Sequence, residues 1–211
     1  MLWGMDGRTD PPEMLRPKEV EPLTGDEPFS GTDATVGDFW SWGFSDLRAN
    51  TTRGGLAEFL VAHAVGAQQR VRDAWDNFDV LSPAGTRIEV KASAYLQSWV
   101  QREHSKISFS RLSGLEFDAS SNEYSAERSV RADVFVFCVH TEREPMAYDP
   151  LDVSKWEFYA VPADAVRAAG TRTVGLAWVR AQAGQPVPFA SLSGAIAAAS
   201  SPGAHEVPGA G

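Results

Sequence analysis

Three charged side chains stand in a stretch that otherwise has the composition of a buried β-strand. In NFDVLSPAGTRIEVKAS, residues 77–93, the charges Asp79, Glu89 and Lys91 lie among Phe, Val and Ile. Two carboxylates and a lysine can hold a divalent cation and balance the charge that develops when a phosphodiester is hydrolysed. Asp76 is an alternative to Asp79 as the first carboxylate.

A β-hairpin would bring these charges together. The segment SPAGT, residues 82–86, has Pro and Gly where a three-residue hairpin loop uses them. Asp79 then faces Glu89, and alternation of side chains puts both on one face with Lys91. The other face carries Phe78, Val80, Ile88 and Val90, and Asp76 by the same parity. Because facing carboxylates repel each other, we expect a cation between them, and oxygen ligands favour Mg²⁺ or Mn²⁺.

A preceding helix offers a further carboxylate. NTTRGGLAEFLVAHAVGA, residues 50–67, predicts a helix capped by Asn50, Thr51 or Thr52 that ends near Gly66. Glu58 is the one acid in its apolar part, and an unpaired buried carboxylate costs several kcal/mol. Either the metal site or Lys91 would supply its partner. The alternative is that Glu58 lies on the solvent side of an amphipathic helix.

The combined pattern resembles the PD-(D/E)XK nuclease superfamily, which includes many restriction endonucleases. RGGLAEF is similar to its helix element, FDVL to its first strand and RIEVKAS to its acid-x-Lys strand. Phe78 stands where the family name has Pro. AYLQSW and WEFYAVP add a resemblance to a group of bacterial proteins. The resemblance covers roughly residues 37–165.

The resemblance implies a restriction-endonuclease-like core and Mg²⁺-dependent hydrolysis of DNA. It implies that Asp79, Glu89 and the Val90 carbonyl bind the metal, that Lys91 is the catalytic lysine, and that Glu58 binds or positions a second metal or a water. Of the four lysines, only Lys91 has an acid two residues before it. A non-catalytic binding module of the same fold is the alternative, and the intact set of four favours the enzyme.

A cluster of basic residues follows the second strand. QREHSKISFSR, residues 101–111, has one acid, and we expect its basic residues to contact phosphates, with Trp99 and Tyr95 stacking on a base. The contact residues are Arg102, His104, Lys106 and Arg111. Gln97 would assist at the site. The alternatives are a solvated basic face and a capping role for Gln97.

The remaining pattern predicts an α/β (α+β) domain with a mixed central sheet flanked by helices. Predicted helices cover residues 38–49, 50–66 and 162–169, and predicted strands cover 75–81, 87–93, 106–110, 133–140 and 156–161. The first helix would bury its aromatic residues Phe39, Trp40, Trp42 and Phe44. We expect a loosely ordered arm at 1–35, the nuclease domain at 36–187 and a small-residue tail at 188–211.

The net charge of −9 over 211 residues opposes nucleic-acid binding, but its distribution is uneven. Residues 1–36 hold eight acids against three bases, which leaves −4 on the other 175 residues. We therefore expect DNA as partner, with RNA as an alternative; a homodimer would supply two active sites for a duplex. No apolar run could span a bilayer, so we expect a cytoplasmic protein without a membrane partner. Cys138 should be a buried, reduced thiol.

Overall fold

A mixed four-stranded sheet organises the protein. The computed structural model describes residues 18, 20–68, 71–72, 76–115, 117–118 and 123–200. The strand order is β1-β2-β6-β7, with β2 parallel to β6 and both outer pairs antiparallel. The strands are β1 (Val80–Leu81), β2 (Arg87–Ala94), β6 (Val134–His140) and β7 (Trp156–Pro162). The expected α+β class with a mixed central sheet is confirmed.

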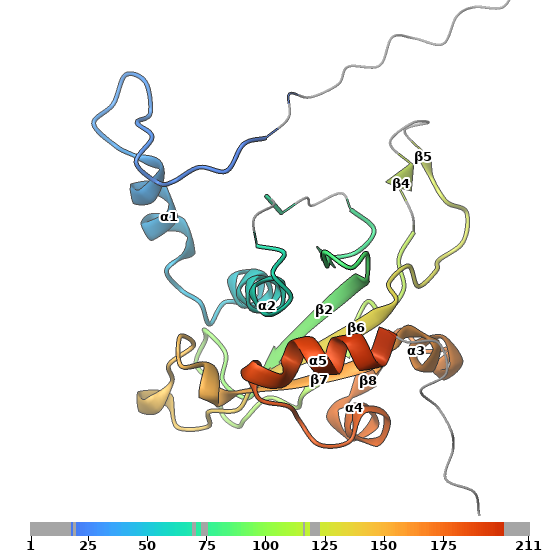
Figure 1. Ribbon diagram of the computed structural model, residues 1–211. Coiled ribbons are helices and arrows are strands. Elements are labelled where there is room, and N and C mark those ends of the chain that lie inside the picture. Colours follow the sequence, from blue (N-terminus) through green and yellow to red (C-terminus); the bar gives the residue numbers. More distant parts are fainter. Residues whose placement is uncertain are drawn as a thin grey trace, which may run out of the picture.

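Structural layers cover both faces of this sheet (Figure 1). Helices α2 (Asn50–Ala64) and α5 (Phe189–Ser200) pack on one face. The other face is covered by α3 (Ala163–Ala169), α4 (Leu176–Ala183) and the antiparallel pair β3 (Ser108–Ser110) and β8 (Thr173–Gly175). A separate two-stranded sheet consists of β4 (Phe117–Asp118) and β5 (Glu123–Tyr124). Two 3-10 turns precede β7, namely η1 (Pro145–Ala147) and η2 (Val153–Lys155).

The central strand β6 is buried along its whole length because both of its faces are covered. Val134, Val136 and Cys138 belong to the core under α2 and α5. Phe135 and Phe137 belong to the second core, where Phe137 meets Phe109 of β3 edge-on at 4.9 Å between ring centroids. Burial raises the pKa of the Cys138 thiol, so the expected buried thiol is confirmed.

The hairpin has the predicted register. Val80 pairs with Ile88, the Ser82 amide donates to the Thr86 carbonyl at 3.0 Å, and Gly85 takes a left-handed φ of 85°. The first strand is shorter than expected, because residues 76–79 form bends. Pairing still reaches one residue beyond β1, since the Asp79 amide donates to the Ile88 carbonyl at 3.0 Å.

The cap predicted for α2 is wrong. Ala49 is the N-cap, and its methyl side chain cannot accept a capping hydrogen bond. Asn50, Thr51 and Thr52 all lie inside the first turn. The Thr52 hydroxyl donates to the carbonyls of Asp46 and Ala49, so the preceding loop uses it to hold the helix start.

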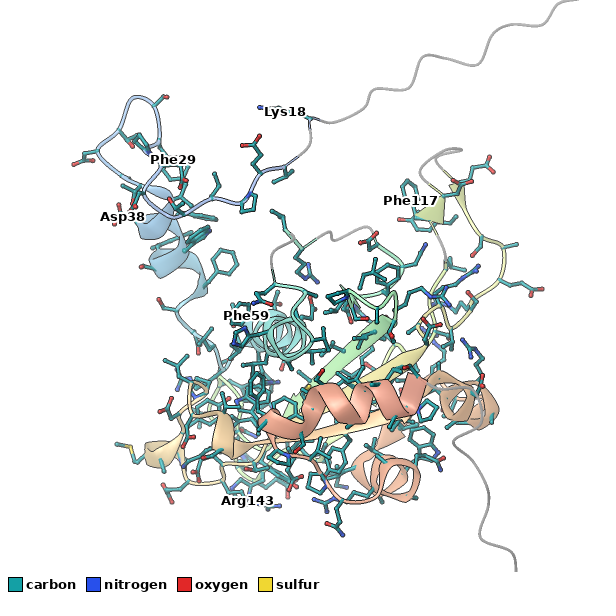
Figure 2. All side chains as sticks on the ribbon, in the orientation of Figure 1. Lys18, Phe29, Asp38, Phe59, Phe117 and Arg143 are labelled. Atoms are coloured by element: carbon teal, nitrogen blue, oxygen red, sulfur yellow. The ribbon has the colours of Figure 1, made fainter. Side chains whose placement is uncertain are left out.

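The aromatic residues of α1 (Val36–Phe44) are exposed, which corrects the prediction that they enter the core. Trp42 is 85% exposed, and Phe39 and Phe44 pack edge-on against each other. The helix projects from the body together with the residues before it, and Phe29 and Asp38 lie in this projecting unit (Figures 1 and 2). Within the expected arm, the Gly37 amide donates to the Gly25 carbonyl at 2.8 Å, so residues 25–35 fold back on α1. Residues 1–17 lie outside the described part.

The packed body continues past the expected boundary at Val187. Helix α5 occupies residues 189–200 of the expected tail and buries Leu192 and Ile196 in the core. Phe189 at its start packs on Phe158 of β7, and the many Ala and Ser residues between these bulky side chains let the helix lie close to the sheet. Residues 201–211 are outside the described part. No helix in the described ranges has the length and apolarity needed to cross a membrane.

Candidate active site

Asp79 lies at the entrance of the hairpin, mostly buried. Its carboxylate accepts a hydrogen bond from the Val90 amide at 2.7 Å. Burial, then the negative charges of Glu89 and Glu58, raise the pKa of Asp79 to about 7; the Val90 hydrogen bond and Lys91 only partly oppose this. Burial and the two neighbouring carboxylates therefore disfavour the charged form of Asp79, and a bound cation would favour it.

Glu89 and Lys91 lie side by side on β2. The two residues share one face, as predicted, and the Lys91 ammonium donates to Glu89 Oε1 at 2.5 Å. Their side chains are 21% and 19% exposed, respectively. The register with β6 places them beside Phe135 and Phe137. The acid-x-Lys pair is thus half-buried, with its charged ends in a cleft.

Glu58 pairs with Arg72 and not with Lys91, which was one of its two predicted partners. Its carboxylate forms a bidentate ion pair with Arg72 and is only 14% exposed, which excludes the solvent-facing alternative. Glu58 lines a cavity of about 230 Å³ with Asp79 and another of about 750 Å³ with Lys91. It therefore reaches the site although α2 covers the opposite face of β2. The sequence around Arg72 contains no motif that could have predicted its ion pair with Glu58.

Asp76 remains close to the site. The parity argument that placed it on the other face does not hold, because residues 76–79 are not strand. Asp76 is exposed and lines the same cavities as Asp79. Phe78 also lines the cleft instead of joining Val80 in the core.

The carboxylates of the site match a divalent metal in their chemistry but are not arranged as a ligand set. Within the described ranges, no three His, Cys, Asp or Glu side chains are grouped closely enough to hold an ion. Glu89 is engaged by Lys91 and Glu58 by Arg72, so both would have to exchange an ion pair for the metal. The donor chemistry does fit, because the carboxylates of Glu58 and Glu89 lie near enough to Asp79 to raise its pKa, and carboxylate oxygens are the ligands that Mg²⁺ and Mn²⁺ prefer.

Two adjoining clefts meet at Lys91. One of about 570 Å³ and the one of about 750 Å³ share Lys91 and Arg111. Together they are lined by eight basic and four acidic residues, which gives a positive cleft in a chain of net charge −9. The basic residues are Arg53, Arg72, Lys91, Lys106, Arg111, Arg128, Arg131 and Arg172. The acidic ones are Glu58, Asp76, Asp79 and Glu89.

The predicted phosphate contacts divide into two groups. Lys106 and Arg111 line the cleft that holds Lys91. Arg102 and His104 line a separate cavity of about 660 Å³, where His104 Nε2 bonds the Arg143 carbonyl. The structure brings the first group to the site and leaves the second aside.

The other predicted contacts have local partners. Gln97 lines the Lys91 cleft, as predicted for a residue that assists at the site. Its side-chain oxygen accepts a hydrogen bond from Arg53 at 3.2 Å, and its side-chain amide donates one to the Ala94 carbonyl at 2.9 Å. These local bonds also agree with the alternative prediction of a capping role. The ring of Tyr95 is covered by the Arg143 guanidinium at 3.8 Å. Trp99 is exposed and lines both this cleft and the separate cavity.

A family model of bacteriophage T4 endonuclease IV matches residues 43–176. The chain belongs to this endonuclease family. The matched range contains α2, the hairpin, β6, β7 and the basic residues of the cleft. No curated protein matches the chain. The nuclease-type family is thus confirmed, whereas membership of the PD-(D/E)XK superfamily stays a prediction.

Proposed function

We propose that the protein is a metal-dependent nuclease that hydrolyses phosphodiester bonds of DNA with a carboxylate-lysine site of the PD-(D/E)XK type. The observation that carries the proposal is the hairpin: Asp79, Glu89 and Lys91 converge on a cleft whose lining is net positive. Membership of an endonuclease family supports the same conclusion.

The carboxylates Asp79 and Glu89, with Glu58 assisting, would hold Mg²⁺ or Mn²⁺, and the Val90 carbonyl would complete the set. When bound, such an ion supplies polarisation of the phosphate and a lower pKa for the attacking water. The Val90 amide keeps the Asp79 carboxylate oriented. Because Asp79 has a pKa near 7, its readiness to bind a cation rises as pH passes through neutrality.

If Glu89 held a cation, Lys91 would lose its present partner, and its ammonium would be free to bind a phosphate oxygen in the same cleft. A half-buried lysine aimed at the phosphate stabilises the negative charge of the transition state more strongly than one in open water. Within the described ranges Asp79 has no ion-pair partner and feels Lys91 and Arg72 only through long-range electrostatics, so its carboxylate would be available to a cation.

Cleavage assays test the proposal. Purified protein would be incubated with linear, nicked, branched and single-stranded DNA, with Mg²⁺, Mn²⁺ or EDTA. We expect cleavage only with metal, and a loss of about 10²–10⁴-fold in Lys91→Ala. The matched control is Lys18→Ala, which removes the same charge from an exposed position far outside the cleft. Binding without cleavage of any substrate, in wild type and Lys91→Ala alike, would favour the non-catalytic binding module.

A further inference from the structure

Two arginines follow directly from the same end of the β3–β8 pair. Ser110, the last residue of β3, is opposite Thr173, the first residue of β8, so Arg111 and Arg172 are the next residues of the two chains. The Leu112 amide donates to the Arg172 carbonyl at 3.4 Å, so the two chains are still in contact there. Both arginines also line one cleft, and like charges held in the same cleft repel each other. An anion bound by the two guanidinium groups would offset this repulsion.

Neither arginine side chain pairs with a carboxylate among the described residues. In the part of the chain that the structure describes, no ion pair or side-chain hydrogen bond involves Arg111 or Arg172. Both line the 570 Å³ cleft that contains Glu89 and Lys91. Arg128 lines the same cleft and is held in place by donating to the Ser113 carbonyl at 3.2 Å.

The backbone at Arg111 adds a second observation. Its φ of 58° is the one positive value at a non-glycine position among the described residues. A side chain with a Cβ atom adopts this left-handed conformation at an energetic cost that glycine avoids. An arginine kept at such a position, at the rim of a candidate active site, points to a use for its side chain.

We propose that Arg111 and Arg172, with Arg128 beside them, form a seat for a backbone phosphate of the nucleic-acid strand that occupies the cleft. The seat adjoins the phosphate position at Lys91, so it would hold the strand on one side of the bond to be cut. Guanidinium groups suit this role because their planar N–H pairs bind two phosphate oxygens at once. The inference rests on the proposed function.

Binding measurements without metal test the seat apart from catalysis. A fluorescein-labelled DNA duplex and its single strand would be titrated in EDTA at several salt concentrations, with wild type, Arg111→Gly and Arg172→Gln. Each variant should weaken binding about tenfold and lower the slope of log Kd against log salt by about one. The control Arg102→Gln removes an exposed arginine that lines the other cavity, and it should leave the slope unchanged.

Arg111→Gly also separates binding from folding. Glycine accepts the φ of 58° without strain, so this variant should melt at or above the temperature of the wild type while it binds DNA less tightly. Wild-type affinity and salt slope in both arginine variants, an equal loss in Arg102→Gln, or no DNA binding by the wild type would each overturn the seat. If DNA binds through these arginines but is never cut, the seat stands and the proposed catalysis fails.

Discussion

The two faces of β2 differ in what they contact, although they alternate residue by residue. Ile88 and Val90 pack beneath α2 in the core, and Ile88 has no exposed surface. Glu89 and Lys91 point to the other side, where they pair with each other and line a cleft. On that side, Phe109 of β3 covers Phe137 of β6, whereas the charged ends on β2 stay accessible.

This difference shows how a single strand, β2, can contribute to the stability of the core with one face and to a candidate active site with the other. The apolar face anchors the strand, and the backbone geometry then holds the neighbouring charged residues within the reach of one another. It follows that substitutions on one face should change stability, and substitutions on the other should change activity.

The largest effect is expected on the charged face. Glu89→Gln removes a metal ligand of the proposed site and should lower kcat/KM by about 10³-fold, equivalent to about 4 kcal/mol of activation free energy. The melting temperature should change little, because the residue is partly exposed. Cleavage kinetics and thermal melts of the same preparation would check this. A large drop in melting temperature would show that the two faces are not separable.

On the apolar face, Ile88→Ala should reduce the free energy of unfolding by about 3 kcal/mol, because it leaves a cavity beneath α2. Urea titration measures this loss, and Ile88→Val serves as the milder control, with a loss of about 1 kcal/mol. The protein that remains folded should cut DNA at close to the wild-type rate. A direct loss of activity in fully folded Ile88→Val would contradict the comparison.

Asp79 should give a pH-dependent effect of intermediate size. Its pKa is about 7 in the folded protein against an ordinary value of 3.8, so the folded state keeps a proton that the unfolded state releases. The metal-free wild type should therefore lose stability as pH rises from about 4 to 7. Asp79→Asn cannot ionise and should be the more stable protein at pH 8, by about 2 kcal/mol.

Urea titrations of both proteins in EDTA at pH 5 and pH 8 would measure the effect of Asp79. Addition of Mg²⁺ at pH 8 should stabilise the wild type more than Asp79→Asn. Parallel pH profiles for the two proteins would mean that Asp79 does not carry excess negative charge.

The smallest effect is expected for the partner of Glu58. Arg72→Gln should cost about 1 kcal/mol of stability, because the arginine is largely exposed but its loss leaves the mostly buried Glu58 carboxylate without this partner. The freed Glu58 carboxylate should lower the Mg²⁺ concentration needed for half-maximal cleavage. Arg48→Gln, which breaks an exposed pair with Asp46, is the control and should leave that concentration unchanged. An increased Mg²⁺ requirement in Arg72→Gln would show that the ion pair helps to form the site.

Local patterns in the sequence were sufficient for the hairpin and for the charged set on it. The turn SPAGT has one good loop conformation, and alternation then decides which side chains share a face. The same reasoning failed at residues 76–79, where the chain leaves the strand and alternation no longer applies. It failed also for the helices at both ends of the domain.

Burial of those helices could not be read from their composition. Aromatic-rich α1 exposes its aromatic side chains, whereas alanine-rich α5 packs Leu192 and Ile196 into the core, because packing depends on whether another element lies against a helix. Propensity and apolar content measure only the tendency of a segment to fold and pack.

The sequence by itself determined the hairpin, its register and the acid-x-Lys pair, because these depend on contacts between residues close along the chain. Only the tertiary structure decided that Arg72 holds Glu58, that Arg111 and Arg172 line one cleft, and that an acidic chain has a positive cleft. Those contacts join residues separated by many positions, and the packing of whole layers around the sheet brings them together.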